Sequence, residues 1–382
     1  MDKKKILIVS SSFYPQNSPR SFRTTELVKE FARQGHEVTL LTLKDDQEHL
    51  LFEEKHGVTI KDIGPLSFPR IQLNGTNGIG SLFKRVVRRG MLQFFEYPDI
   101  ELLFRVKKAL KRESGYDLLI SIAVPHPIHW GVAWAWRTKN PIAKTWVADC
   151  GDPYMGETLD SFRKMFYFKY AEKHFCRKAD VITVPIESAK DGYYPEFRDK
   201  IAVIPQGFSF DEVAIDQASY TKHEVPTFAY AGGFIPGGRD PRPFIDYIVN
   251  TKDDFKLILY TRNGDLVEPW LEKADGRIEI RDYIPRPKLL KTLSTMDFLV
   301  NFENQSPLMM PSKLIDYYLA GRPVLNISSN GLDTDKISRF LKGDYSEKLI
   351  YNGVDQYRIE NVCGRFLDLC SKNEIGNGTI QQ

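Results

Sequence analysis

The sequence predicts an α/β protein built from two doubly wound, Rossmann-like domains. Short aliphatic runs such as KILIVSS and EVTLLT are continuous rather than alternating, which is typical of parallel strands buried on both faces. Segments with helical spacing separate these runs. The chain has 382 residues, more than one hydrophobic core usually organises. We therefore expect a first domain over residues 1–210 and a second over residues 211–382.

The rhythm of strands and helices can be followed through both halves. Strands are expected at KILIVSS, EVTLLT, DLLISIA, AKTWVAD, VITVP and IAVIPQG, and in the second half at FAYAGG, FKLILYT, RIEIRDYI, DFLVNF and PVLNIS. SFRTTELVKEFARQG predicts a helix with Phe22, Leu27 and Phe31 on one face and Gly35 at its end. DQYRIENVCGRFLDLCSKN predicts a last helix with one apolar face, which can pack back toward the first domain.

Composition excludes several classes of protein. A net charge of +3 with 27% charged residues is too balanced to indicate a nucleic-acid partner. The four cysteines lack C-x-x-C spacing, so we expect core thiols in a reducing compartment. No window approaches the roughly 20 apolar residues of a membrane-spanning helix, and the first apolar run is too short for a signal peptide. These features predict a cytoplasmic protein.

The stretch PSKLIDYYLAGRPVL combines a helix start with charged side chains. Ser312 follows a proline and would open a helix whose free amides, together with Lys313, attract a phosphate. Asp316 lies one turn further on the same side and could accept hydrogen bonds from ribose hydroxyls. The alternative for Lys313 and Asp316 is an exposed ion pair on a solvated helix.

Five stretches together resemble glycosyltransferase family 4, whose members are retaining, nucleotide-sugar-dependent enzymes of the GT-B fold. They are ILIVSSSFYPQNSPRSFRTTELVKEFARQGHEVTLLT, WVADCGDPY, EKHFCRKADVITVPIESAKD leading to IAVIPQGF, YAGGFIPGGRDPRPF and PSKLIDYYLAGRPVL. The resemblance covers nearly the whole chain and implies two Rossmann-like domains that face a central cleft. It implies sugar transfer from a UDP- or GDP-linked donor to a glycan or lipid-linked glycan, in bacterial surface polysaccharide or glycoconjugate synthesis.

The resemblance implies that the second domain binds the donor. Asp316 stands where the family has a ribose-binding acid, usually glutamate. A family glutamate eight residues earlier is replaced by Leu308, so neighbouring loop amides would contact the donor sugar. Glu303, at a strand end, could substitute for the missing glutamate, and the alternative for it is a plain surface side chain. Gly233 stands where similar transferases often carry an arginine, which leaves Arg239 as the expected diphosphate ligand, with a solvated loop arginine as the alternative. Arg262 is a weaker candidate for the missing charge. The implied donor-binding residues are Gly233, Arg239, Arg262, Tyr283, Ile284, Leu308, Met309, Ser312, Lys313 and Asp316.

The first domain is expected to hold the acceptor. In SSSFYPQNSPRSFR, Arg20 or Arg23 would open a helix beneath a phosphate, whereas Ser18 could simply cap that helix. In WVADCGDPY a strand ends in Asp149 and Asp152, and the resemblance places one aspartate of this segment near the transferring bond; turn capping is the alternative for Asp152. The expected set is Asp149 and Asp152 for catalysis and Ser18, Arg20, Arg23 and His126 for acceptor and phosphate, with a structural role as the alternative for the histidine.

A basic and apolar segment offers a contact with lipid. Residues 81–95, SLFKRVVRRGMLQFF, place four cations beside bulky apolar side chains, which suits the interface of an anionic bilayer. The stretch FRKMFYFKYAEKHFCRK has the same chemistry. The sequence thus favours either a peripheral contact with the inner face of the plasma membrane or a core-packed helix with a basic outer face.

No essential metal or cofactor is expected besides the donor substrate. No Asp-x-Asp follows a strand in the first half, and no histidine pair has the spacing of metal ligands on a helix. Two other functions stay open at the level of sequence. One is a nucleotide- or glycan-binding GT-B protein without turnover, and the other is a GT-B-like sugar-nucleotide epimerase or phosphorylase.

Overall fold

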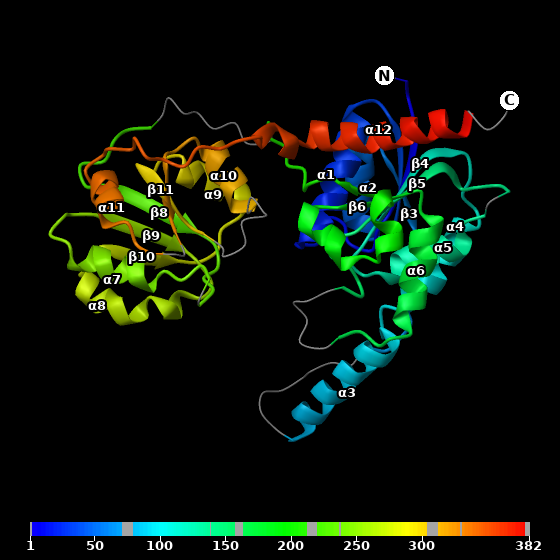
Figure 1. Cartoon of the computed structure of the whole chain (residues 1–382), viewed down its shortest axis with the longest axis horizontal. Coiled ribbons are helices and arrows are strands. Elements are labelled where there is room, and N and C mark those ends of the chain that lie inside the picture. Colours follow the sequence, from blue (N-terminus) through cyan, green and yellow to red (C-terminus); the bar gives the residue numbers. More distant parts are fainter. Residues whose placement is uncertain are drawn as a thin grey trace. The chain divides into compact units, whose positions relative to one another are not determined.

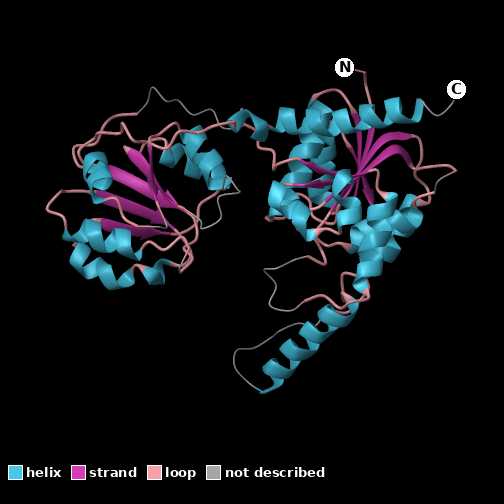
Figure 2. Ribbon diagram, in the orientation of Figure 1, coloured by secondary structure: helices cyan, strands magenta, loops and turns pink. Residues whose placement is uncertain are grey.

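The computed structural model divides the chain into two compact units, Met1–Ser209 with Asp355–Gln382, and Phe210–Val354. The structure describes residues 2–70, 79–137, 139–156, 163–211, 220–236, 238–303, 312–328 and 331–378. Each unit is a parallel sheet covered by helices (Figure 1, Figure 2). The chain passes between the units at Ser209 and Phe210, and residues 355–382 return to the first unit instead of staying with residues 210–354.

The first unit is built on a seven-stranded parallel sheet with the order β3-β2-β1-β4-β5-β6-β7. The strand order reverses between β1 and β4, and open α/β sheets bind ligands at such a point, beyond the carboxyl ends of the strands. The patterns above do not predict β3, a short edge strand in which only Ile60 is buried. The strands are β1 (Lys5–Val9), β2 (Glu37–Thr42), β3 (Thr59–Asp62), β4 (Tyr116–Ile122), β5 (Ala143–Asp149), β6 (Val181–Val184) and β7 (Ile201–Val203).

Helices cover both faces of this sheet. One apolar cluster lies beneath α1, α2 and α12, and a second lies beneath α4, α5 and α6. The four cysteines of the chain are buried and free, as predicted. The helices are α1 (Pro19–Arg33), α2 (Asp46–His56), α3 (Ile79–Phe95), α4 (Glu101–Leu110), α5 (Pro127–Ala135), α6 (Phe168–Lys178) and α12 (Ile359–Gly378), with 3₁₀ turns at Glu187–Gly192 and Pro195–Lys200.

The first helix, α1, ends where its sequence predicts. Gly35 follows it with φ 88°, a conformation that favours glycine. Leu27 and Phe31 are fully buried, but Phe22 is 49% exposed. The expectation that all three share one face is wrong, because five helical residues rotate a side chain by about 140° from its starting direction.

The last helix, α12, completes the first unit from far along the chain. Its Phe366 is fully buried in the same cluster as Phe31 of α1. The N–H of Ile359 donates to the carbonyl of Phe208 at 2.9 Å, which ties the start of α12 to the segment after β7. Gly207 permits this approach, because a Cβ there would lie 2.5 Å from Cδ1 of Ile359.

The second unit is a five-stranded parallel sheet with the order β10-β9-β8-β11-β12, and its strand order reverses between β8 and β11. Four of the five strands lie within the predicted runs, and β8 begins one residue before its run, at Thr227. The apolar faces of α9 and α10 pack on one side of the sheet, and α7 and α11 pack on the other. The elements are β8 (Thr227–Ala231), α7 (Arg242–Asn250), β9 (Lys256–Tyr260), α8 (Leu271–Ala274), β10 (Ile278–Arg281), α9 (Arg286–Leu293), β11 (Phe298–Phe302), α10 (Ser312–Ala320), β12 (Val324–Ile327) and α11 (Thr334–Leu341), with 3₁₀ turns at Gly264–Leu266 and Glu268–Trp270. A further 3₁₀ turn, Val354–Tyr357, lies where the chain returns to the first unit.

The basic helix α3 stands away from the sheet of the first unit (Figure 1). Its apolar side chains are open to solvent, with exposed fractions of 63% for Leu82, 68% for Phe83 and 62% for Val86. The alternative of a core-packed helix is therefore wrong for this segment. Among the described residues, no helix is long and apolar enough to cross a membrane.

Candidate functional site

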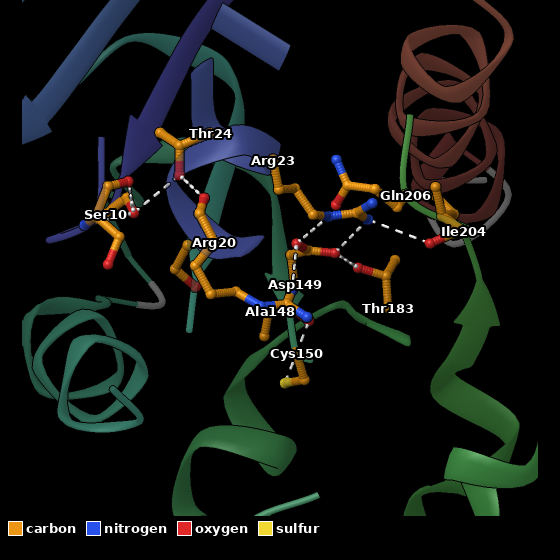
Figure 3. Close-up of polar contacts among 12 residues, drawn as sticks. Ser10, Arg20, Arg23, Thr24, Ala148, Asp149, Cys150, Thr183, Ile204 and Gln206 are labelled. Atoms are coloured by element: carbon orange, nitrogen blue, oxygen red, sulfur yellow. Dashed lines mark hydrogen bonds and ion pairs between the residues drawn. The ribbon is translucent and has the colours of Figure 1, made fainter. Parts of the chain in front are cut away.

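The carboxyl edge of the first unit is organised around a buried ion pair. Asp149 ends β5 and is fully buried. Its carboxylate accepts hydrogen bonds from Nε (2.6 Å) and Nη2 (2.7 Å) of Arg23 in α1, and from Oγ1 of Thr183 at 2.7 Å. Figure 3 shows these side chains pointing at one another. Bidentate contact between a guanidinium and a carboxylate is the strong form of a charge-assisted hydrogen bond.

The same guanidinium joins segments that are far apart in sequence. Its Nη1 donates to the carbonyl of Pro205 (2.7 Å) and its Nη2 to that of Ile204 (3.2 Å), both after β7. It also lies 5.5 Å from the ring centroid of Phe366 in α12. Arg23 and Asp149, expected at a phosphate and at the reacting centre, are thus engaged with each other and with the backbone. Their geometry favours a structural role.

Arg20, one turn before Arg23, keeps part of its charge accessible. Its Nη1 lies 4.0 Å from Oδ2 of Asp149, and its side chain is 20% exposed. Burial lowers the pKa of Arg20, and the nearby carboxylate of Asp149 opposes this shift. The guanidinium covers Gly151, where a Cβ would lie 2.3 Å from Nη2, so a larger residue would displace the arginine. The next residue, Asp152, is exposed.

Ser18 and His126 make contacts that serve the fold. The Oγ of Ser18 accepts a hydrogen bond from the N–H of Ser21 at 3.1 Å, which is the capping alternative. His126 is buried at the start of α5, and its ring centroid lies 4.9 Å from that of Tyr154. Burial, helped by the neighbouring His129, lowers the pKa of His126 well below its usual range. The histidine is therefore neutral and packs against the loop that follows β5.

That loop, residues 150–156, is held by a carboxyl group that the sequence patterns do not reveal. Glu172 of α6 is fully buried, and its Oε1 accepts the N–H groups of Tyr154 and Met155, each at 3.2 Å. Burial raises the pKa of Glu172 to about 7, although the two backbone bonds oppose the shift. The signal that could have found it is a glutamate on the apolar face of α6. The loop is thus fixed from inside while Asp152 faces outward.

In the second unit, two cations meet after β8. Gly232 has φ 150°, and a Cβ there would lie 3.1 Å from Oη of Tyr230, whose hydroxyl donates to the carbonyl of Gly233 at 2.9 Å. Nζ of Lys313 lies 4.7 Å from the Tyr230 ring centroid. Within the described ranges, Nζ of Lys313 and Nε of Arg239 are buried without a hydrogen-bond partner. Burial, with a smaller effect from Arg239, lowers the pKa of Lys313 to about 7.

Asp316 has a partner that the sequence patterns do not suggest. Nε of Arg286, the first residue of α9, donates to Oδ1 of Asp316 at 2.8 Å. Burial raises the pKa of Asp316, and Arg286 opposes this shift. No ion pair joins Lys313 to Asp316 in the part of the chain that the structure describes, so the alternative of a surface pair does not hold. The only local signal for Arg286 is its position at a helix start.

Arg262 and Tyr283 come together beyond the ends of β9 and β10. The guanidinium of Arg262 lies 5.2 Å from the ring centroid of Tyr283, and that ring is 53% exposed. Ile284, the next residue, packs half-buried against the apolar cluster beneath α9 and α10. An exposed aromatic ring of this kind can stack on a planar group such as a nucleobase.

Glu303 follows β11 and lines a cavity of about 250 Å³, together with Gly238 and Ser328 from the loops after β8 and β12. The side-chain amide of Asn326 donates to its carboxylate. Of the remaining predicted donor residues, Leu308 and Met309 lie outside the described residues, and Ser312 opens α10 with a side chain that also lies outside them.

Comparisons with known proteins place this chain among sugar-transferring enzymes. The model of a family described as Glycosyltransferase Family 4 matches residues 22–212, which is half of the chain. That segment carries most of α1, the ion pair of Arg23 with Asp149, and the loop after β5. No curated protein matches the sequence.

Several solved structures resemble the chain along almost its whole length. A glycosyltransferase from Rickettsia africae is 11% identical with a TM-score of 0.61, over 98% of this chain and 99% of that one. A point mutant of TarM from S. aureus, in complex with Fondaparinux, alpha-GlcNAc-glycerol and UDP, is 11% identical with a TM-score of 0.56, over 96% and 100%. The catalytic domain of starch synthase IV from Arabidopsis thaliana, bound to ADP and acarbose, is 9% identical with a TM-score of 0.52, over 97% and 99%. These likenesses confirm the predicted GT-B fold.

Asp149→Asn should destabilise the first unit, because it leaves the guanidinium of Arg23 buried without a counter-charge. We expect the free energy of unfolding to fall by about 3–5 kcal/mol. Asp199→Asn is the matched control on an exposed side chain of the same unit and should change it by less than about 0.5 kcal/mol. Equal effects of the two variants would contradict the structural role. Tryptophan fluorescence during urea denaturation reports mainly on this unit, because it contains four of the five tryptophans, Trp130, Trp134, Trp136 and Trp146.

Glu172→Gln should change how stability depends on pH. The folded pKa of about 7 lies above the ordinary value of 4.5, so the folded chain retains a proton that the unfolded chain releases, and wild-type stability falls as pH rises through this window. Glutamine keeps the Oε1 acceptor but cannot ionise. We therefore expect the variant to melt higher than wild type at about pH 8 and to match it near pH 4.5.

The control for this comparison is Glu54→Gln, a change on an exposed residue of α2. Its melting temperature should follow wild type at both pH values. A difference between Glu172→Gln and wild type that is the same at both pH values would contradict the raised pKa.

Proposed function

Because the chain belongs to the family described as Glycosyltransferase Family 4, we propose that it transfers a sugar from a nucleoside-diphosphate donor to a hydroxyl of a glycan or lipid-linked glycan, with retention at the anomeric carbon. One observation carries the donor side of this proposal. Nζ of Lys313 is buried beside Gly232 and Arg239 and, among the described residues, has no hydrogen-bond partner. This cluster follows β8, next to the reversal of strand order where open α/β sheets bind ligands.

In this proposal the donor diphosphate lies between Lys313 and Arg239. A buried cation without a counter-ion is unfavourable, and the lowered pKa of Lys313 is a direct consequence. A diphosphate supplies the missing negative charge and restores the proton. When the bond between the anomeric carbon and the diphosphate breaks, the same two cations and the amides that open α10 stabilise the leaving group. The proposal invokes no metal.

In this proposal Asp316 and Tyr283 hold the nucleoside part of the donor. The carboxylate of Asp316, oriented by Arg286, can accept hydrogen bonds from ribose hydroxyls. The exposed ring of Tyr283, backed by Arg262, offers a stacking surface for the base. Each contact uses a side chain that another charged side chain already orients, which reduces the entropy lost on binding.

We assign the acceptor to the first unit, where Asp152 is exposed on the loop held by Glu172. Its carboxylate could accept the proton of the acceptor hydroxyl or stabilise positive charge that develops on the sugar ring. Arg20 lies beside it and would hold an anionic group of the substrate. Asp149 contributes indirectly, because its bond to Arg23 fixes the strand end from which this loop begins.

The helix α3 suggests that the enzyme binds its acceptor at a membrane surface. Leu82, Phe83 and Val86 point to one side of the helix, whereas exposed cations point to the other. A helix that is exposed on both an apolar and a basic face suits the interface of a bilayer rich in anionic lipid. In our proposal α3 lies in this interface and brings a lipid-linked acceptor to the first unit. The cations are Lys84, Arg85 and Arg88.

The donor site predicts a proton uptake on binding. Since the free amine of Lys313 has a pKa of about 7 and an ion-paired ammonium a higher one, affinity for UDP or GDP should fall above about pH 7.5, approaching tenfold per pH unit. Titration calorimetry in buffers of different ionisation enthalpy measures both the affinity and the proton uptake. Lys313→Arg keeps a cation that cannot be neutralised and should remove the pH dependence.

Lys348→Arg is the control, because Lys348 is exposed in the same unit. Its affinity should follow pH as wild type does. Wild-type affinity that is independent of pH would overturn the assignment of Lys313, and the absence of binding to either nucleotide would overturn the proposed donor. Release of the nucleoside diphosphate from a sugar nucleotide only when an acceptor is present would separate a transferase from an epimerase or a binding protein.

The membrane contact can be tested by reversing charge on α3. Changing Lys84, Arg85 and Arg88 together to glutamate should abolish sedimentation with vesicles of phosphatidylglycerol and phosphatidylethanolamine, since each cation contributes about 1 kcal/mol near an anionic surface. Nucleotide affinity should not change. The matched control carries the same charge change at exposed cations on and after α4, namely Lys108, Lys111 and Arg112. Equal loss in both triple variants would defeat the assignment to α3.

A further inference from the structure

The base of α3 is anchored by a buried carboxylate. Glu96 directly follows the helix, has φ 52° and is buried in the first unit. A positive φ is uncommon for a residue other than glycine and persists only where surrounding contacts hold it. Further polar contacts of the last turn join the side chain of Gln93 to the carbonyl of Arg163 and the hydroxyl of Tyr167 to the carbonyl of Phe94. The helix is thus fixed at this end.

The partners of Glu96 come from the loop that displays Asp152 and from the segment just before α6. The hydroxyl of Tyr154 donates to Oε2 of Glu96 at 2.8 Å, and Nζ of Lys164 donates to the same oxygen at 3.1 Å. Nζ of Lys164 also lies 4.6 Å from the ring centroid of Tyr154. These three groups, Glu96, Tyr154 and Lys164, are called the clasp below. The lysine balances the buried carboxylate, so the clasp is electrically satisfied without a ligand.

Tyr154 is part of both the clasp and the loop of residues 150–156. Its side chain is in the clasp, while its backbone N–H donates to Glu172 and its ring packs against His126. Only Pro153 separates it from Asp152. A displacement of Glu96 would therefore be carried by one hydrogen bond into the loop of residues 150–156. At the other end of this loop, Arg20 covers Gly151 and restricts its movement.

We propose that the clasp couples docking of α3 on an anionic membrane to the position of Asp152 in the loop of residues 150–156. The inference rests on the proposed membrane contact and acceptor site, and it adds positioning residues to both. Tyr154 and Glu96 touch neither donor nor acceptor in this scheme. They position the carboxylate of Asp152, which does touch the acceptor. The loop of residues 150–156 is therefore ordered when the enzyme lies on the membrane that carries its acceptor.

Hydrogen–deuterium exchange tests the coupling without an identified acceptor. The probe is a vesicle of phosphatidylglycerol and phosphatidylethanolamine. In the wild-type chain we expect vesicles to slow exchange both in residues 79–95 and in residues 150–156. In Tyr154→Phe, which loses the hydroxyl but keeps the ring, slowing should persist in residues 79–95 and be lost in residues 150–156.

Tyr194→Phe is the matched control. It lies in the same unit, and Nζ of Lys173 lies 4.2 Å from its ring centroid, as Lys164 lies over Tyr154. It should respond to vesicles as wild type does. Thermal unfolding of each variant checks the fold, and Lys164→Met, which loosens Glu96 from the other side, should repeat the loss if Tyr154→Phe is poorly folded.

Each outcome decides the coupling. Slowing confined to residues 79–95 in the wild-type chain overturns it while leaving membrane docking intact, and a wild-type response in Tyr154→Phe overturns it as well. Absence of slowing in residues 79–95 removes the docking and the coupling together. Nucleotide titrations are independent of all these results, so failure of the coupling is distinguishable from failure of the proposed donor site.

Discussion

The buried ion pair of Arg23 with Asp149 is the interaction on which the first unit depends. Two charges removed from water are unfavourable unless each is paired and hydrogen-bonded, and here the carboxylate has three donors and the guanidinium also reaches two backbone carbonyls. Such a pair adds little net stability over a well-packed apolar core, but it tolerates few alternative arrangements. It thereby fixes α1, β5, β6 and the segment after β7 at one point.

The second unit also buries cations, but there the described part of the protein supplies no carboxylate to pair with them. Lys313 and Arg239 lie close enough for one to lower the pKa of the other, and among the described residues neither is paired as Arg23 is. In the first unit burial is compensated within the protein. In the second unit, a ligand would have to supply the negative charge. We therefore interpret the cluster of Lys313 and Arg239 as a binding site and the pair of Arg23 with Asp149 as a structural element. The distinction depends on partners and not on residue type.

Local sequence patterns were sufficient for most of the fold, because continuous aliphatic runs and helix ends are properties of neighbouring residues. They missed β3, which buries one side chain, and they placed Phe22 on the wrong face of α1. The candidate sites were partly predictable, since Gly233, Lys313 and Asp152 all follow strands or open helices at the carboxyl edge. Glu172, Arg286 and Glu96 were not, because their importance comes from partners that are distant in sequence. The same limit applies to Asp149, whose strand-end position is equally compatible with catalysis and with a buried pair.

The return of α12 to the first unit has a consequence for biosynthesis. A ribosome releases the chain from the N-terminus, so the whole second unit emerges before Phe366, and it can fold while the first unit still lacks its last helix. Until then, the apolar surface around Phe31 is open to solvent and is a natural binding site for a chaperone. Chains interrupted before residue 359 would keep that surface exposed and be recognisable to quality control, so closure by α12 marks a chain whose two units have both been translated.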